Sequence, residues 1–114
     1  MKIKITLLFI LFLIQSNAQQ ITWNKKYFQP IKHFNAAISI NQLPDSGFII
    51  LANKYNVGSY GKVIRTNKYG DSIWVKIIEV TQKLITTYDN GFMLSGYDGN
   101  GSFLKKLNSN GDTI

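Results

Sequence analysis

Short apolar runs alternate with clusters of glycine, asparagine, aspartate and serine along most of the chain. The clusters recur about every eight to twelve residues, a rhythm typical of antiparallel β-strands joined by turns. Beyond the N-terminal region, no segment shows the apolar period of an amphipathic helix. The pattern therefore predicts an all-β protein built from antiparallel strands.

The first expected strand covers residues 36–43 and ends at a turn with the sequence Pro-Asp-Ser-Gly. Proline presets φ, aspartate and serine bond nearby amides, and glycine permits a positive φ, so this tetrapeptide favours a tight turn. The next strand, residues 48–54, opens with four apolar residues in a row, which predicts that both of its faces are covered. The remaining expected strands are residues 62–66, 72–80, 83–87, 92–97 and 102–107.

Two blocks of sequence occur twice. Residues 45–51 (DSGFIIL) return as 89–95 (DNGFMLS), a shift of 44. The block NKYGDSI, which begins at Asn67, returns as NSNGDTI with a shift of 41. A fixed period in this range is typical of stacked supersecondary units that cannot bury their own faces alone. The sequence therefore predicts four-stranded antiparallel repeat units at about 36–80 and 83–114, the second one truncated within its fourth strand.

The segment before the first unit also fits the repeat. Residues 21–25 (ITWNK) are similar to the stretch around Trp74 (SIWVK), so we expect a lone leading strand at 21–28. Trp23 and Trp74 then occupy equivalent positions, and packing between units is the expected role of both side chains.

Residues 1–18 have the pattern of a secretory signal peptide. Two lysines form a short basic region, residues 5–14 are an apolar run interrupted only by Thr6, and small residues ending at Ala18 suit cleavage by a signal peptidase. A membrane anchor is the rival interpretation, but the apolar run is ten residues long and a spanning helix needs about 20. We expect a mature chain of residues 19–114 that is secreted, periplasmic or at the cell surface, without a stable membrane span.

Composition narrows the choice of partners. The chain has no cysteine, so no disulfide framework can support a small core. The formal net charge is +7, and removing the two lysines of the signal peptide leaves +5 for the mature chain. These basic residues are scattered singly or in pairs, which indicates solvated strand faces rather than a nucleic-acid surface.

Carboxylates are few, and four of the six recur at repeated turns. Asp45 and Asp89 share one equivalent position, and Asp71 and Asp112 share another. A residue type that recurs at the same turn favours a structural role, namely capping of that turn. A paired-acid glycosidase site is the rival, but nothing in the sequence brings two acids in unequal environments to a common face.

Other chemical motifs are weak. The single histidine, His33, has no partner at metal-ligand spacing. Residues 98–102 (DGNGS) resemble the start of a calcium loop, but no glutamate stands at the twelfth position. Its Asp-Gly and Asn-Gly pairs instead favour a type I′ hairpin turn with two positive φ values. The sequence thus predicts no catalytic, cofactor-binding or metal-binding residue.

The repeated D-[SN]-G-F-[IM]-[IL] block at residues 45–50 and 89–94 and the K-Y-G-D-S-I-W block at 68–74 resemble the blade repeat of secreted bacterial β-propeller-like proteins of the Bacteroidetes type. The resemblance implies antiparallel four-stranded blades, here incomplete at about two. It also implies that the chain is a fragment of a larger propeller-like protein.

Tyrosines are the best candidates for ligand or partner contacts. Tyr55, Tyr60 and Tyr97 lie near the ends of second strands or in the loops that follow, residues 56–61 and 98–101, where aromatic side chains can stack on sugar rings or grip a protein. We therefore expect an exported, non-catalytic β-repeat scaffold or binding module with a protein or glycan partner, no cofactor and no nucleic acid.

Three further expectations follow. Exposed blade faces would favour self-association. The alternative function is a fragment of a propeller-fold enzyme, hydrolase-like, whose active-site residues lie in other blades, because fold alone does not decide function. A gene remnant with no selected function is the third interpretation.

Overall fold

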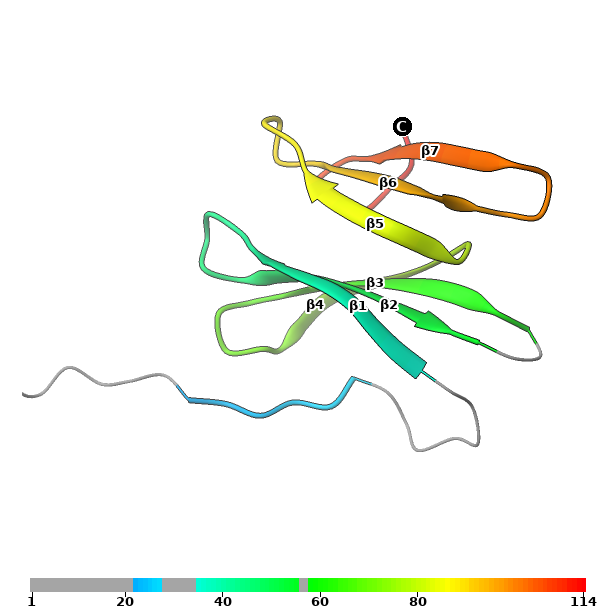
Figure 1. Cartoon of the computed structure of the whole chain (residues 1–114). Helices are drawn as coiled ribbons and strands as arrows, with labels where there is room; N and C mark the ends of the chain where they lie inside the picture. The colour runs from blue at the N-terminus through cyan, green and yellow to red at the C-terminus, as the bar shows by residue number, and fades with distance from the viewer. Residues whose placement is uncertain (1–21, 28–34, 56–57) are drawn as a thin grey trace, which may run out of the picture.

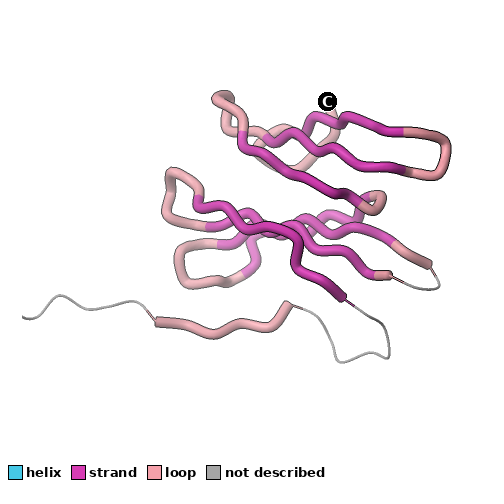
Figure 2. The backbone as a smooth tube through the Cα atoms, in the orientation of Figure 1, coloured by secondary structure: helices cyan, strands magenta, loops and turns pink. Residues whose placement is uncertain are grey.

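A computed structural model describes residues 22–27, 35–55 and 58–114 of the chain. Every regular element in these ranges is a strand, and the strands form two antiparallel sheets (Figure 1, Figure 2). The all-β class predicted from the rhythm of the turns is confirmed. The strands are β1 (Asn35–Gln42), β2 (Phe48–Lys54), β3 (Tyr60–Thr66), β4 (Ser72–Ile78), β5 (Thr81–Thr86), β6 (Phe92–Tyr97) and β7 (Ser102–Leu107).

Some strand boundaries differ from the expected ones by one or two residues. β3 begins at Tyr60 rather than at residue 62, because Tyr60 pairs with Lys54 and extends the ladder to the end of β2. β4 ends at Ile78 rather than at residue 80, since β5 already begins at Thr81. The expected leading strand at 21–28 is not formed within the described residues 22–27, which pair with no strand.

Within each sheet, every strand pairs with the strands next to it in sequence. The first sheet has the order β1-β2-β3-β4 and the second has the order β5-β6-β7. After β7 the chain turns back, and Thr113 forms an isolated antiparallel bridge with Leu107. Ser72 pairs with Thr66 in the same way in the first sheet. Residue 113 therefore stands, relative to β7, where β4 begins relative to β3.

The turn between β1 and β2 and its counterpart between β5 and β6 share an unexpected backbone geometry. The sequence assigned the positive φ to glycine, but Ser46 and Asn90 carry it, with φ of 68° and 62°. Gly47 and Gly91, which follow them, are required for a different reason. A Cβ at either position would collide with a backbone carbonyl of the neighbouring strand.

The turn after β3 and the turn after β7 are nearly identical. Asn67 Oδ1 accepts hydrogen bonds from the amides two and four residues later at 2.9 and 3.0 Å, and Asn108 Oδ1 does the same at 2.9 and 3.0 Å. Gly70 and Gly111 have φ of 80° and 81°, a left-handed conformation that favours glycine. The repeated sequence block therefore encodes a repeated turn.

The turn between β6 and β7 closes with a hydrogen bond from the amide of Asp98 to the carbonyl oxygen of Gly101 at 3.2 Å. The expected hairpin is present, but the type I′ geometry was wrong. Gly99 has a positive φ of 89°, whereas Asn100 does not have one.

The main core lies between the two sheets (Figure 1). Because successive side chains of a strand point to opposite faces, Ile49 and Leu51 of β2 face the second sheet and Ile50 faces away. The residues of this core are Leu43, Ile49, Leu51, Val63, Leu84, Phe92, Leu94 and Leu107, with Trp74 and Ile78 partly buried against them.

A buried amide joins the first sheet to the start of the second. Asn53 is only 1% exposed. Its Nδ2 donates to the carbonyl oxygen of Thr81 at 2.8 Å, and its Oδ1 accepts from the amide of Thr81 at 3.2 Å. The side chain of Asn53 therefore satisfies both backbone groups of the first residue of β5.

The face of the first sheet that points away from the second sheet is also apolar, and we call it the outer face. Ile40, Ile50, Ile64 and Val75 form one row across its four strands. Residues 22–27, the leading segment, lie against this side of the first sheet (Figure 1). Exposed apolar side chains of β1 and β4 remain, namely Ile38, Ile40, Ile73, Val75 and Ile77.

Candidate functional site

Two of the three tyrosines proposed as partner contacts lie where β2 and β3 meet their connection. Tyr55 directly follows β2, and its hydroxyl accepts a hydrogen bond from Asn53 Nδ2 at 3.1 Å. Tyr60 is the first residue of β3 rather than part of a loop. The ammonium group of Lys54 lies 5.3 Å from the centroid of its ring, a cation–π contact.

Tyr97 ends β6 on the second sheet and is 56% exposed. The β2–β3 connection and the β6–β7 turn lie at the same end of the two sheets, on the right in Figure 1. We call this the tyrosine end. The structure therefore places Tyr55, Tyr60 and Tyr97 at one end of the molecule, two on the first sheet and one on the second.

The acids of the repeated turns perform structural tasks. The carboxylates of Asp45 and Asp89 accept from the amides of Gly47 and Gly91 at 2.9 and 3.2 Å. Asp45 also pairs with Arg65 at 3.1 Å, and Asp89 pairs with Lys106 at 2.8 Å. The glycine amide is the main cause that lowers the pKa of Asp45, and the Lys106 ammonium is the main cause that lowers the pKa of Asp89.

The other acids also have partners. Lys105 pairs with Glu79 at 2.6 Å and holds the pKa of that carboxyl below its usual range. Asp98 accepts from the amide of Asn100 at 3.0 Å within the β6–β7 turn. In the described ranges, no three His, Cys, Asp or Glu side chains are placed to hold a metal ion together. His33 lies outside the described residues, as does the expected signal peptide, residues 1–18.

Trp74 makes one of the contacts between the two sheets, and we call it the Trp74 junction. Trp74 of β4 meets Phe92 of β6 edge to face, with centroids 6.0 Å apart and planes inclined at 68°. Its ring lies so close to Gly111 that a Cβ there would be 2.9 Å from two ring atoms. Two residues after the tryptophan, Lys76 pairs with Asp112 at 2.9 Å.

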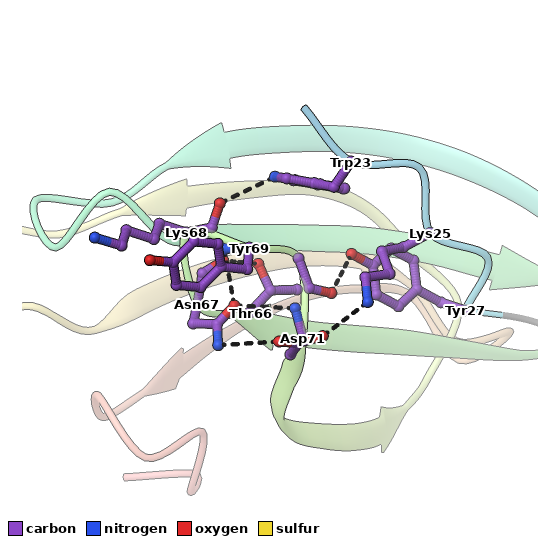
Figure 3. A network of polar contacts seen from close by, with 9 residues as sticks. Trp23, Lys25, Tyr27, Thr66, Asn67, Lys68, Tyr69 and Asp71 are labelled. Atoms are coloured by element: carbon purple, nitrogen blue, oxygen red, sulfur yellow. Dashed lines mark hydrogen bonds and ion pairs between the residues drawn. The ribbon is translucent and has the colours of Figure 1, made fainter. Parts of the chain in front are cut away.

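The leading segment makes the same contacts with the first sheet, at the Trp23 junction, and Figure 3 shows the polar contacts of this junction. Trp23 meets Phe48 with centroids 5.6 Å apart and planes inclined at 67°. Its ring covers Gly70, where a Cβ would be 2.7 Å from the nearest ring atom. Lys25, again two residues after the tryptophan, pairs with Asp71 at 2.9 Å.

Two further hydrogen bonds hold the leading segment. Trp23 Nε1 donates to the carbonyl oxygen of Lys68 at 3.0 Å, and the Tyr27 hydroxyl donates to that of Gly70 at 2.8 Å. The Lys25 ammonium is the main cause that lowers the pKa of Asp71, and the Asp71 carboxylate raises the pKa of Lys25 in return. Trp74 therefore packs between the two sheets, as predicted, whereas Trp23 packs the leading segment onto the first sheet.

A cleft of about 810 Å³ lies between the sheets at the end opposite the tyrosines. Arg65 lines it and is held by Asp45 and by the carbonyl oxygen of Ser109, to which Nη1 donates at 2.9 Å. Sequence reasoning missed this cleft. The available signal was the sequence repeat, which places Arg65 and Lys106 at equivalent positions and does the same for Asp45 and Asp89.

In the ranges that the structure describes, no helix is long and apolar enough to cross a membrane. Comparison of the chain with known protein families, with curated proteins and with solved structures gives no match.

Proposed function

We propose that the chain is an exported, non-catalytic β-repeat module of the propeller-blade type that binds a protein or glycan partner at its tyrosine end. The observation that carries the repeat character is the duplicated junction. Trp23 contacts Phe48 and Gly70 in the same way as Trp74 contacts Phe92 and Gly111. A contact set that recurs from one sheet to the next is what stacked repeat units need.

The binding role is supported by the placement of the tyrosines. Tyr55, Tyr60 and Tyr97 combine flat apolar rings with a hydroxyl, and they belong to two adjacent sheets at one end. Such side chains stack on sugar rings and fill pockets of protein partners at low entropic cost. The acids, by contrast, are engaged in turns and ion pairs, which favours a scaffold over a hydrolase.

Export and self-association belong to the same proposal. Residues 1–18 have the composition of a signal peptide, and N-terminal sequencing of the mature protein is expected to begin at Gln19. The exposed isoleucines and valine of the outer face form a surface that would favour stacking of copies.

The partner site is tested by replacing Tyr55, Tyr60 and Tyr97 together with alanine in the full chain. Binding to a panel of glycans and cell-surface proteins is expected to fall by about tenfold or more, since buried aromatic anchors dominate interface energies. The matched control replaces Tyr69 and Tyr88, exposed tyrosines in the turns of the opposite end.

The control variant is expected to bind as the natural chain does, with unchanged far-ultraviolet circular dichroism in both variants. Equal binding by the triple variant and the natural chain would refute the assignment of the site. An equal loss in both variants would show that the tyrosine end has no special role.

A further inference from the structure

The two junctions define one recognition pattern. In each, a tryptophan meets a phenylalanine edge to face, its ring covers a glycine with φ near 80°, and the lysine two positions later reaches the aspartate that follows that glycine. The bare glycine is what admits the ring, because a Cβ would lie within 3.0 Å of it. The surface at each junction is therefore complementary to a segment with the sequence Trp-X-Lys, where X is any residue.

The two segments are held in different ways. Trp74 belongs to β4, which is fixed in the first sheet by its ladder with β3. Trp23 belongs to the leading segment, which pairs with no strand. The polar contacts described for that segment run from the side chains of Trp23, Lys25 and Tyr27, and Trp23 remains 36% exposed. Exposed ion pairs of this kind contribute little to affinity.

The leading segment also leaves the surface beneath it incompletely filled. An apolar cleft of about 620 Å³ lies between residues 25–27 and the outer face, where Ile38, Ile40 and Ile50 line it. A segment anchored by side chains over such a cleft can leave and rebind without breaking a strand ladder.

We propose that the surface formed by Phe48, Gly70 and Asp71 is a binding site for Trp-X-Lys segments, and that it exchanges its own leading segment for that of a second copy of the chain. The occupant follows from the sequence, because the chain has two tryptophans and only Trp23 lies outside a strand. Reciprocal exchange of identical segments joins two copies at low cost. The proposal does not depend on the tyrosine end.

The test supplies the segment from outside. A fluorescent peptide with the sequence of residues 22–27 (TWNKKY) is titrated into the full chain carrying Trp23→Ala and Lys25→Ala, and binding is followed by anisotropy. We expect it to bind this vacated chain about tenfold more tightly than the natural chain, whose own segment competes. A peptide with alanine in place of tryptophan is expected to lose about tenfold in affinity.

Substitutions in the two equivalent aspartates separate the site from general effects. Asp71→Lys in the vacated chain is expected to weaken binding of the peptide about tenfold, because it replaces the partner of the lysine with a like charge. Asp112→Lys, the same change at the Trp74 junction, is expected to leave peptide binding unchanged. Absence of binding, or an affinity that Asp71→Lys leaves unchanged, overturns the binding site.

Exchange between copies is read separately by size-exclusion chromatography with light scattering. The natural chain is expected to form a dimer whose fraction falls when excess TWNKKY peptide is added or when Trp23 is replaced by alanine. A natural chain that stays monomeric at every concentration, or a dimer that the peptide does not affect, overturns the exchange. Loss of partner binding in the tyrosine variants would bear on neither result.

Discussion

The Trp23 and Trp74 junctions use the same residues in the same geometry, yet they differ in depth. The centroid distances to phenylalanine are 5.6 and 6.0 Å, and both ion pairs measure 2.9 Å. Trp74 packs against the main core, whereas Trp23 packs against the outer side of the first sheet. The comparison shows that these residues determine how units dock, and that the backbone ladder behind them determines how firmly.

The two junctions also differ in one hydrogen bond, because the same carbonyl position accepts from a different donor in each. At the Trp23 junction, the carbonyl oxygen of Lys68 accepts from the indole nitrogen. At the Trp74 junction, the equivalent carbonyl oxygen, that of Ser109, accepts from Arg65 instead. Trp74 Nε1 is buried and has no hydrogen-bond partner among the described residues. The Trp74 junction, which is more deeply buried, therefore has more apolar contact than the Trp23 junction, but it lacks the hydrogen bond of the indole nitrogen.

The largest expected difference comes from truncating each tryptophan. Trp74→Ala removes a large ring from the contact between the sheets and is expected to lower the free energy of unfolding by about 3 kcal/mol. Trp23→Ala is expected to cost about 1 kcal/mol or less, since its ring is partly exposed and lies on a segment outside the ladders. Denaturant unfolding followed by circular dichroism measures the free energy of unfolding of both variants. Equal losses would contradict the expectation that the Trp74 junction contributes more stability than the Trp23 junction.

The second comparison concerns Asn53 and Tyr97, which occupy equivalent positions at a shift of 44. Asn53→Ala leaves the amide and carbonyl of Thr81 without their buried partner and is expected to cost about 2 kcal/mol. Tyr97→Ala changes an exposed residue and is expected to alter stability by no more than about 0.5 kcal/mol. The same unfolding experiment measures both variants. A loss of stability above about 0.5 kcal/mol for Tyr97→Ala would show that the face of the second sheet that points away from the first sheet is covered.

The smallest effect is expected from pH. The pKa of Asp71 lies below its ordinary value of 3.8, so the ion pair with Lys25 stabilises the Trp23 junction above that pH. This contribution is lost as the pH falls through the lowered value, because the folded state must then bind a proton that it disfavours. In a Trp74→Phe variant, where Trp23 is the remaining tryptophan, emission is expected to shift to the red below about pH 4.

The matching control is Asp71→Asn in the same background. It removes the titrating group, so its emission is expected to change little across this pH range. A shift of the same size in the control would assign the effect to other acids, such as Asp45 or Asp89.

Much of the fold could be predicted from sequence, because it depends on local chemistry. The bounds of β2, β6 and β7 match their predictions, since each strand is bracketed by a recognisable turn. The similarity between residues 21–25 and the stretch around Trp74 also predicted packing positions for both tryptophans.

What the sequence could not provide depends on contacts between distant residues. Gly47 is needed beneath a carbonyl of β3, a constraint that the turn sequence itself does not reveal, and the positive φ falls on Ser46 instead. The leading segment has the sequence of a fourth strand but pairs with no strand, and only tertiary context decides that. Arg65 reaches Ser109 across the two sheets, at a separation no motif encodes.

The pairing of each strand with its sequence neighbour has a consequence for folding kinetics. Every ladder closes through a short connection, so the loop-closure entropy of each step is small and the contact order of each sheet is low for a β-protein. The two sheets can therefore nucleate independently, each from its own hairpins. Docking of Trp74 onto Phe92 would then be the late, rate-limiting association of two preformed halves, and stopped-flow tryptophan emission would lag behind the circular dichroism signal.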